Sequence, residues 1–286
     1  TAPQFQQGRA APQASVRRKG KLQHLHVTDS IGRNMIYPTL ENSTGSLILP
    51  VTATPSVYDE RAFNPQQNVQ SVLQSQLNTG AHYHTVIFGA PSVDITNQDV
   101  SQGALEQNKV ETMTSVNNMV EAANYALETG QVEQVIIMQH YPRWDTHRDD
   151  PYGAKPYLVE LANTTLVKMV DESRHSDRIM VGVPTGLQVE GQARTDLMTN
   201  CGDNWRSRNV KNGKFDGIHY YSRQGQEALT DSMMEVLRQA GLVKQARAPA
   251  PRVADNQWKV VGRGPRGAAP APAPFNIPLN NRFMGN

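Results

Sequence analysis

The sequence predicts a three-layer α/β/α domain built on a five-stranded parallel sheet. Apolar runs of strand length alternate with longer amphipathic segments through most of the chain, which is typical of strands joined by crossover helices. Hydrophobic residues make up 38% of the 286 positions, and the mean hydropathy is −0.55. These values favour a soluble protein with a modest core, and no apolar run approaches the ~18–20 residues needed to span a bilayer.

The expected elements follow one another in strict alternation. The strands are expected at residues 22–27, 46–53, 85–90, 132–138 and 178–183. The helices are expected from about residue 31, then over 68–77, 104–127, 157–170 and 222–240. Pro50 lacks a ladder donor, so it places the second strand at an edge of the sheet or ends it early. Gly241 is expected just beyond the last helix, at its C′ position.

Charge divides the chain into three parts, for which we expect the boundaries 1–20, 21–243 and 244–286. Residues 1–21 hold five basic residues and no acidic one, and residues 244–286 hold seven basic residues against Asp255. The total of +2 therefore leaves residues 22–243 with a net charge of −9. The basic, Pro/Ala-rich tails suit binding to nucleic acid, to neighbouring subunits or head-to-tail to the acidic domain, but they are equally typical of solvated, disordered ends.

Little in the sequence indicates a compartment. Cys201 is the only cysteine, so no disulfide can form within the chain and a zinc site made of cysteines is disfavoured. The N-terminus has no apolar signal-peptide core and begins with Thr1, which leaves processing open. There is no Walker loop and no GxGxxG motif, so nothing favours a nucleotide-phosphate site.

Two short motifs fall at the expected carboxyl edge of the sheet, where α/β proteins bind their ligands. Thr28-Asp29-Ser30 directly follows the first expected strand, and Asp216-Gly217-Ile218-His219 precedes the last helix. A serine hydroxyl becomes a useful nucleophile only when a base removes its proton. His219 is the candidate base, Asp216 the candidate carboxylate that orients it, and the Ser30 N–H a candidate oxyanion donor.

These motifs resemble the first and last blocks of the SGNH (GDSL-type) hydrolases, over roughly residues 20–243. The resemblance implies a flavodoxin-like sheet and a serine esterase that needs no cofactor and cleaves an acyl or acetyl ester, on a carbohydrate or a lipid. The chain is also similar to the SGNH-like domains that some retroelements of aquatic animals carry.

Three positions depart from the pattern of that family. Thr28 stands where the first block has Gly, and residues 54–57 offer no counterpart to the second-block Gly. The third block aligns best with Pro91-Ser92-Val93-Asp94. Val93 therefore stands where the family has an Asn that donates to the oxyanion. Within this block, Ser92 is left as the candidate donor, beside the Ser30 N–H. Loss of one such donor commonly lowers the rate by about 10²–10³-fold.

Other polar clusters have two interpretations each. Four histidines lie at the starts of two neighbouring expected strands: His24, His26, His82 and His84. They are interpreted either as metal ligands or, more simply, as structural histidines whose hydrogen bonds are satisfied. His140 and Trp144 follow the fourth strand and, with Asp29, are expected to line the substrate pocket, although an ordered loop with a packed Trp144 explains them too. The basic stretch 204–211 suits phosphate contacts or a solvated loop.

Two functions therefore remain open. One is a serine esterase in which Ser30, His219 and Asp216 act together. The other is a catalytically impaired domain kept as an assembly unit, whose tails bind neighbouring subunits or nucleic acid. The intact Ser30 and Asp216–His219 favour the first, and the altered oxyanion positions favour the second.

Overall fold

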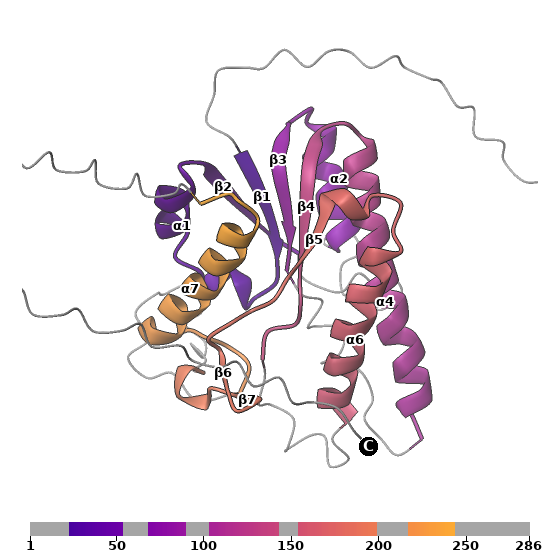
Figure 1. The fold of residues 1–286 in the computed structure, drawn as a ribbon, viewed down its shortest axis with the longest axis vertical. Helices are drawn as coiled ribbons and strands as arrows, with labels where there is room; N and C mark the ends of the chain where they lie inside the picture. Colours follow the sequence, from indigo (N-terminus) through magenta and orange to yellow (C-terminus); the bar gives the residue numbers. More distant parts are fainter. Residues whose placement is uncertain (1–22, 54–67, 90–102, 143–153, 199–216, 244–286) are drawn as a thin grey trace, which may run out of the picture. The chain divides into compact units, whose positions relative to one another are not determined.

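A computed structural model of the chain describes residues 23–53, 68–89, 103–142, 154–198 and 217–243. All of them belong to one compact unit, Thr1–Lys244, and the described residues are the part of it that Figure 1 draws in colour. Both tails lie outside the described residues, so the three-part division of the chain stays a prediction.

The central sheet has five parallel strands, as the sequence predicts. In chain order they are β1 (Gln23–Thr28), β2 (Leu47–Thr52), β3 (Tyr83–Phe88), β4 (Val132–Met138) and β5 (Ile179–Gly182). Their order across the sheet is β2-β1-β3-β4-β5. The strand that contains Pro50 is thus an edge strand, which confirms the prediction from its missing N–H.

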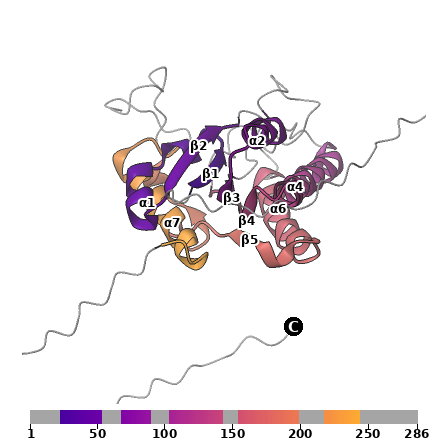
Figure 2. The ribbon, with the colours of Figure 1, turned by 90° about the horizontal axis from the view of Figure 1, so that it is seen from above.

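Helices cover both faces of the sheet, which gives three layers (Figure 2). The helices are α1 (Tyr37–Thr44), α2 (Val69–Asn78), α4 (Leu105–Glu128), α6 (Ala154–Asp171) and α7 (Arg223–Gln239). Side chains from α2, α4 and α6 share one buried cluster with Leu25, Val86 and Ile137 of the sheet. Side chains from α1 and α7 share a second cluster with Ile87 and Ile136, on the opposite face.

Local signals set the ends of several elements. Helix α7 ends as expected before Gly241, which has φ +71°, and the N–H groups of Gly241 and Leu242 bond to the carbonyls of Arg238 and Leu237. Helix α6 begins at Ala154, three residues earlier than expected. Pro156 falls in its first turn, where a missing N–H breaks no intrahelical hydrogen bond.

Other features differ from the expectation. Strand β3 begins at Tyr83 rather than Thr85, because Tyr83 already donates its N–H to Gln131 O at 2.8 Å. A hairpin of two short strands, β6 (Gln188–Val189) and β7 (Gln192–Ala193), follows β5 and was not predicted. Two-residue strands carry too little periodicity to be recognised in a sequence. No helix among the described residues is long and apolar enough to cross a membrane.

Candidate active site

The turn after β1 is built around the side chain of Asp29. Its Oδ1 accepts the N–H groups of Ile31 at 2.8 Å and Gly32 at 3.2 Å. This is the local side-chain-to-backbone bonding that favours Asp in turns. Asp29 is only 7% exposed, so the expected pocket residue holds the turn from inside. The bonds fix the backbone on both sides of Ser30, which is partly exposed at the tip.

Ser30 and His219 meet across 189 positions of sequence. The Oγ of Ser30 lies 3.0 Å from the Nε2 of His219, which is a normal hydrogen-bond distance. A His219 that carries its proton on Nδ1 accepts the hydroxyl proton of Ser30 through Nε2, and that is the geometry of a nucleophile and its base. Both side chains are partly exposed, so a substrate can reach them.

Neighbouring contacts hold both partners of this pair. The side-chain amide of Asn34 donates to Ser30 O at 2.6 Å. On the other side, Tyr220 is fully buried and donates its hydroxyl to Pro142 O at 2.8 Å. Ser222 then caps α7 by accepting the N–H of Gly225 at 3.0 Å. His219 is therefore followed directly by the buried Tyr220 and, two residues later, by the N-cap of α7.

The structure accommodates Thr28, the residue that departs from the family's first block. Its side chain is 1% exposed and lies beneath the turn. A Cβ added to Gly32 would sit 1.9 Å from Thr28 Oγ1, and one added to Gly89 would sit 3.2 Å from the same atom. Two glycines thus leave the space that the Thr28 side chain fills.

Free backbone donors at the turn are few. The N–H groups of Ile31 and Gly32 are taken by Asp29 Oδ1. Within the part of the chain that the structure describes, the N–H of Ser30 has no hydrogen-bond acceptor, so it alone among these three can face an oxyanion.

Two histidines of β1 are buried and electrically neutral. Burial lowers the pKa of His26 to about 3, and its Nδ1 lies 2.9 Å from Tyr37 Oη. Burial, together with the charge of His84, lowers the pKa of His24 to about 4. The His24 and His84 rings meet edge to face with centroids 5.6 Å apart, whereas His82 is exposed. The described ranges contain no group of three or more His, Cys, Asp or Glu side chains that could hold a metal ion.

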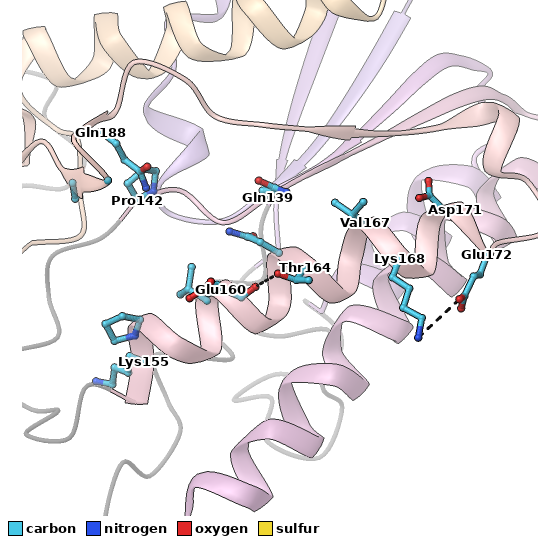
Figure 3. A pocket seen from close by; sticks show the side chains of 15 residues that line it. Gln139, Pro142, Lys155, Glu160, Thr164, Val167, Lys168, Asp171, Glu172 and Gln188 are labelled. Carbon is cyan, nitrogen blue, oxygen red and sulfur yellow. Dashed lines mark hydrogen bonds and ion pairs between the residues drawn. The ribbon is translucent and has the colours of Figure 1, made fainter. Parts of the chain in front are cut away.

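A groove of about 970 Å³ runs between α6 and the β6–β7 hairpin (Figure 3). Its lining includes Gln139 and Pro142 after β4, Asn163 and Val167 of α6, and Gln188 of β6. Ser30 and His219 do not line it, but Pro142 is the residue whose carbonyl Tyr220 binds. The lining of the groove therefore includes a residue that is hydrogen-bonded to the neighbour of His219.

The other expected site residues have mixed outcomes. His140 is 5% exposed, and its backbone N–H donates to Asn163 Oδ1 at 2.9 Å, so it packs against α6 next to the groove. Asp216, Ser92 and Trp144 lie outside the described residues, and their roles stay predictions. The sequence motifs did not assign Asn163 or Tyr37 to the site, because Asn163 stands out only in an Asn-Thr-Thr glycosylation pattern and Tyr37 belongs to no motif.

No protein-family model and no curated protein sequence matches the chain. Solved structures similar to it include a GDSL-like lipase from Bacteroides thetaiotaomicron VPI-5482, at 11% identity and TM-score 0.46, over 76% of this chain and 88% of that one. A carbohydrate acetylesterase family member from Sinorhizobium meliloti has 13% identity and TM-score 0.49, over 76% and 98%. The M. smegmatis aryl esterase has 12% identity and TM-score 0.48, over 76% and 99%.

Identities this low concern the fold alone, so the chemistry of the site has to be argued from its own residues. The similarity to domains carried by retroelements stays a prediction.

Proposed function

We propose that the protein is a serine esterase that cleaves an acyl or acetyl ester through a covalent acyl-enzyme. The observation that carries this proposal is the 3.0 Å contact between Ser30 Oγ and His219 Nε2 at the carboxyl edge of the sheet. Ser30 is the nucleophile and His219 the general base. Asp216 is assigned from the sequence as the carboxylate that orients the imidazole.

The reaction runs in two halves. His219 Nε2 takes the hydroxyl proton while Ser30 Oγ attacks the ester carbonyl carbon, and a tetrahedral oxyanion forms. The protonated imidazole then gives its proton to the leaving alkoxide as the carbon–oxygen bond breaks. In the second half, a water molecule loses a proton to His219 and attacks the acyl carbonyl carbon. The imidazolium then returns that proton to Ser30 Oγ as the bond between Oγ and the acyl carbon breaks, which releases the acid and restores Ser30 and neutral His219.

The oxyanion is served by the N–H of Ser30, the one free donor of the turn. A second donor is assigned to the Ser92 region, which follows β3, the direct neighbour of β1 in the sheet. A donor from there fits the usual pattern of an oxyanion hole assembled from two segments.

The groove along α6 is assigned to the remainder of the substrate. β1 and β4 are separated by one strand, which puts their ends about 10 Å apart at the usual strand spacing. Pro142, one of the residues that line the groove, accepts the hydroxyl of Tyr220, the residue next to His219. A short ester bound at Ser30 thus has room for a larger alcohol or acyl part between α6 and the hairpin.

A fluorophosphonate probe and a short-chain nitrophenyl ester test the proposal on the full chain. We expect the probe to label Ser30, and both Ser30→Ala and His219→Ala to lower labelling and ester turnover by about a thousandfold or more. Ser71→Ala, a serine in α2, is the control and should keep both signals. A wild-type protein that is neither labelled nor turns over any ester would overturn the esterase assignment.

One observation favours the second function, an impaired domain kept for assembly. Two of the three N–H groups at the turn are committed to Asp29 Oδ1, which leaves the oxyanion with one local donor. Under this alternative, deletion of residues 1–20 and 246–286 should abolish oligomers in size-exclusion chromatography. Binding of a polyanion that weakens steeply with salt would identify nucleic acid as the partner of the tails. A full chain that is monomeric and binds no polyanion contradicts the assembly function.

A further inference from the structure

A buried polar pair lies beneath the turn that carries Ser30. His26 on β1 is 1% exposed, and its Nδ1 lies 2.9 Å from the hydroxyl of Tyr37, the first residue of α1. The same hydroxyl lies 3.2 Å from the carbonyl oxygen of Gly32. Neither side chain has a role in the ester chemistry described above. A buried polar contact of this kind needs an explanation in terms of what it holds.

Counting protons fixes the direction of both bonds. Tyr37 has one hydroxyl proton, and Gly32 O can only accept, so Tyr37 donates to Gly32 O. His26 must then donate from Nδ1 to Tyr37 Oη, which leaves its Nε2 unprotonated. Nε2 is buried with no hydrogen-bond partner among the described residues. A bare lone pair there is tolerated better than a buried N–H without an acceptor.

Gly32 is the point at which this pair reaches the active site. Its N–H is held by Asp29 Oδ1 at 3.2 Å, and its carbonyl oxygen accepts both the N–H of Met35 at 3.1 Å and the hydroxyl of Tyr37. Gly32 has no side chain of its own with which to fix the turn. The bond from Tyr37 therefore ties the far end of the turn to α1 and, through His26, back to β1.

We propose that His26 and Tyr37 are positioning residues that hold the Asp29–Gly32 turn and so aim the hydroxyl and the N–H of Ser30. The proposal rests on the esterase function for its effect on rate, but its effect on the turn does not depend on activity. Among the described residues, no hydrogen bond joins either side chain of the pair to Ser30 or His219.

Tyr37→Phe removes the shared hydroxyl and keeps the ring. We expect the amide protons of Ile31 and Gly32 to exchange about tenfold faster in this variant, because the turn loses one of its ties. We also expect the maximal rate of fluorophosphonate labelling to fall about tenfold with an unchanged half-saturating concentration. Misaligned reacting groups lower the chemical step rather than binding.

Tyr83→Phe is the matched control. Tyr83 is also buried, and its hydroxyl donates to Gln76 Oε1 at 3.4 Å, between β3 and α2. The Tyr83→Phe change likewise removes one tyrosine hydroxyl and its hydrogen bond, in the cluster on the opposite face of the sheet. If both variants change turn exchange and labelling equally, the effect is a general loss of stability and the proposal is overturned.

Variants of His26 test the direction of the bonds. Asn in place of His26 can offer its amide N–H near the position of Nδ1, whereas Leu offers no donor. We expect His26→Asn to keep turn protection within about threefold of wild type. His26→Leu should lower it, but less than Tyr37→Phe does, because Tyr37 can still donate to Gly32 O. The double variant His26→Leu/Tyr37→Phe should be no worse than Tyr37→Phe alone, because His26 acts on the turn only through Tyr37.

A spectroscopic reading completes the test. The ¹⁵N spectrum of the His26 ring should show a protonated Nδ1 and a bare Nε2, and the opposite tautomer would overturn the proposal. If wild-type Ser30 is not labelled at all, the esterase function fails, and amide exchange alone then decides the positioning role. Unchanged exchange at Ile31 and Gly32 in Tyr37→Phe overturns that role whatever the activity.

Discussion

At the scale of single residues, the fit between Thr28 and Gly32 decides whether the turn can form. A Cβ on Gly32 would lie 1.9 Å from Thr28 Oγ1, which is far inside contact distance. We therefore expect Gly32→Ala to lower the free energy of unfolding by about 3 kcal/mol, at the upper end of overpacking effects. Urea unfolding followed by circular dichroism measures this change.

A second substitution shows whether the clash is the cause. Thr28→Gly removes the hydroxyl, and by itself it costs about 1 kcal/mol because a strand-end glycine gains freedom on unfolding. The double variant Thr28→Gly/Gly32→Ala should be more stable than the sum of the single changes predicts, by about 2 kcal/mol. Strict additivity would contradict the explanation.

At the scale of residues, the sequence predicts position best for a motif that directly follows a strand or precedes a helix. Ser30 and His219 were expected at one edge of a parallel sheet, and their side chains do meet there. The sequence predicts only that Thr28 departs from the Gly of the SGNH pattern. It does not predict that Gly32 and Gly89 leave room for the Thr28 side chain, because that depends on three-dimensional proximity. The contact of Tyr37 with His26 depends on how α1 packs, which no local pattern reveals.

At the scale of elements, the start of α7 sets the position of the His219 loop. Ser222 accepts the N–H of Gly225 and lies three residues after His219. Ser222→Ala should lower the free energy of unfolding by about 1 kcal/mol, as for other N-cap losses. It should also slow the labelling of Ser30 several-fold, because a frayed first turn loosens the loop that carries the base.

Asn68→Ala separates these two effects. Asn68 caps α2 by accepting the N–H of Ser71 at 2.7 Å, so its loss should cause a similar drop in stability. We expect Asn68→Ala to keep the wild-type rate of Ser30 labelling. Ser222→Asp restores a cap acceptor and should recover most of the labelling rate that Ser222→Ala loses. Equal labelling by both alanine variants would show that α7 capping does not position His219.

Elements were predicted well where periodicity ran long enough. The bounds of β4 match the expected 132–138, and both the edge position of β2 and the stop of α7 follow from single Pro and Gly residues. The β6–β7 hairpin was missed because its two-residue strands have no periodic signal. The groove it forms with α6 was missed with it, since a groove is a property of two elements together.

At the scale of the whole molecule, the buried histidines make stability depend on pH. The pKa of His24 is about 4 in the folded protein, against about 6.5 when the chain is unfolded, because burial and the charge of His84 disfavour its charged form. Below pH 6.5 His24 binds a proton in the unfolded chain but stays neutral in the folded chain. The stability contributed by neutral His24 is therefore complete above pH 6.5 and is lost as pH falls toward 4.

His24→Phe isolates this contribution. Both ring nitrogens of His24 are buried without hydrogen-bond partners among the described residues, and the ring meets His84 edge to face, so Phe can take its place. We expect the variant to be as stable as wild type or more so at pH 7.5. Between pH 6 and 5 its free energy of unfolding should fall less steeply than that of wild type, by about 1 kcal/mol per pH unit. Urea unfolding at half-unit pH steps gives both slopes. Identical slopes would mean that His24 is protonated as readily in the folded chain as in the unfolded one, and that it does not contribute to acid sensitivity.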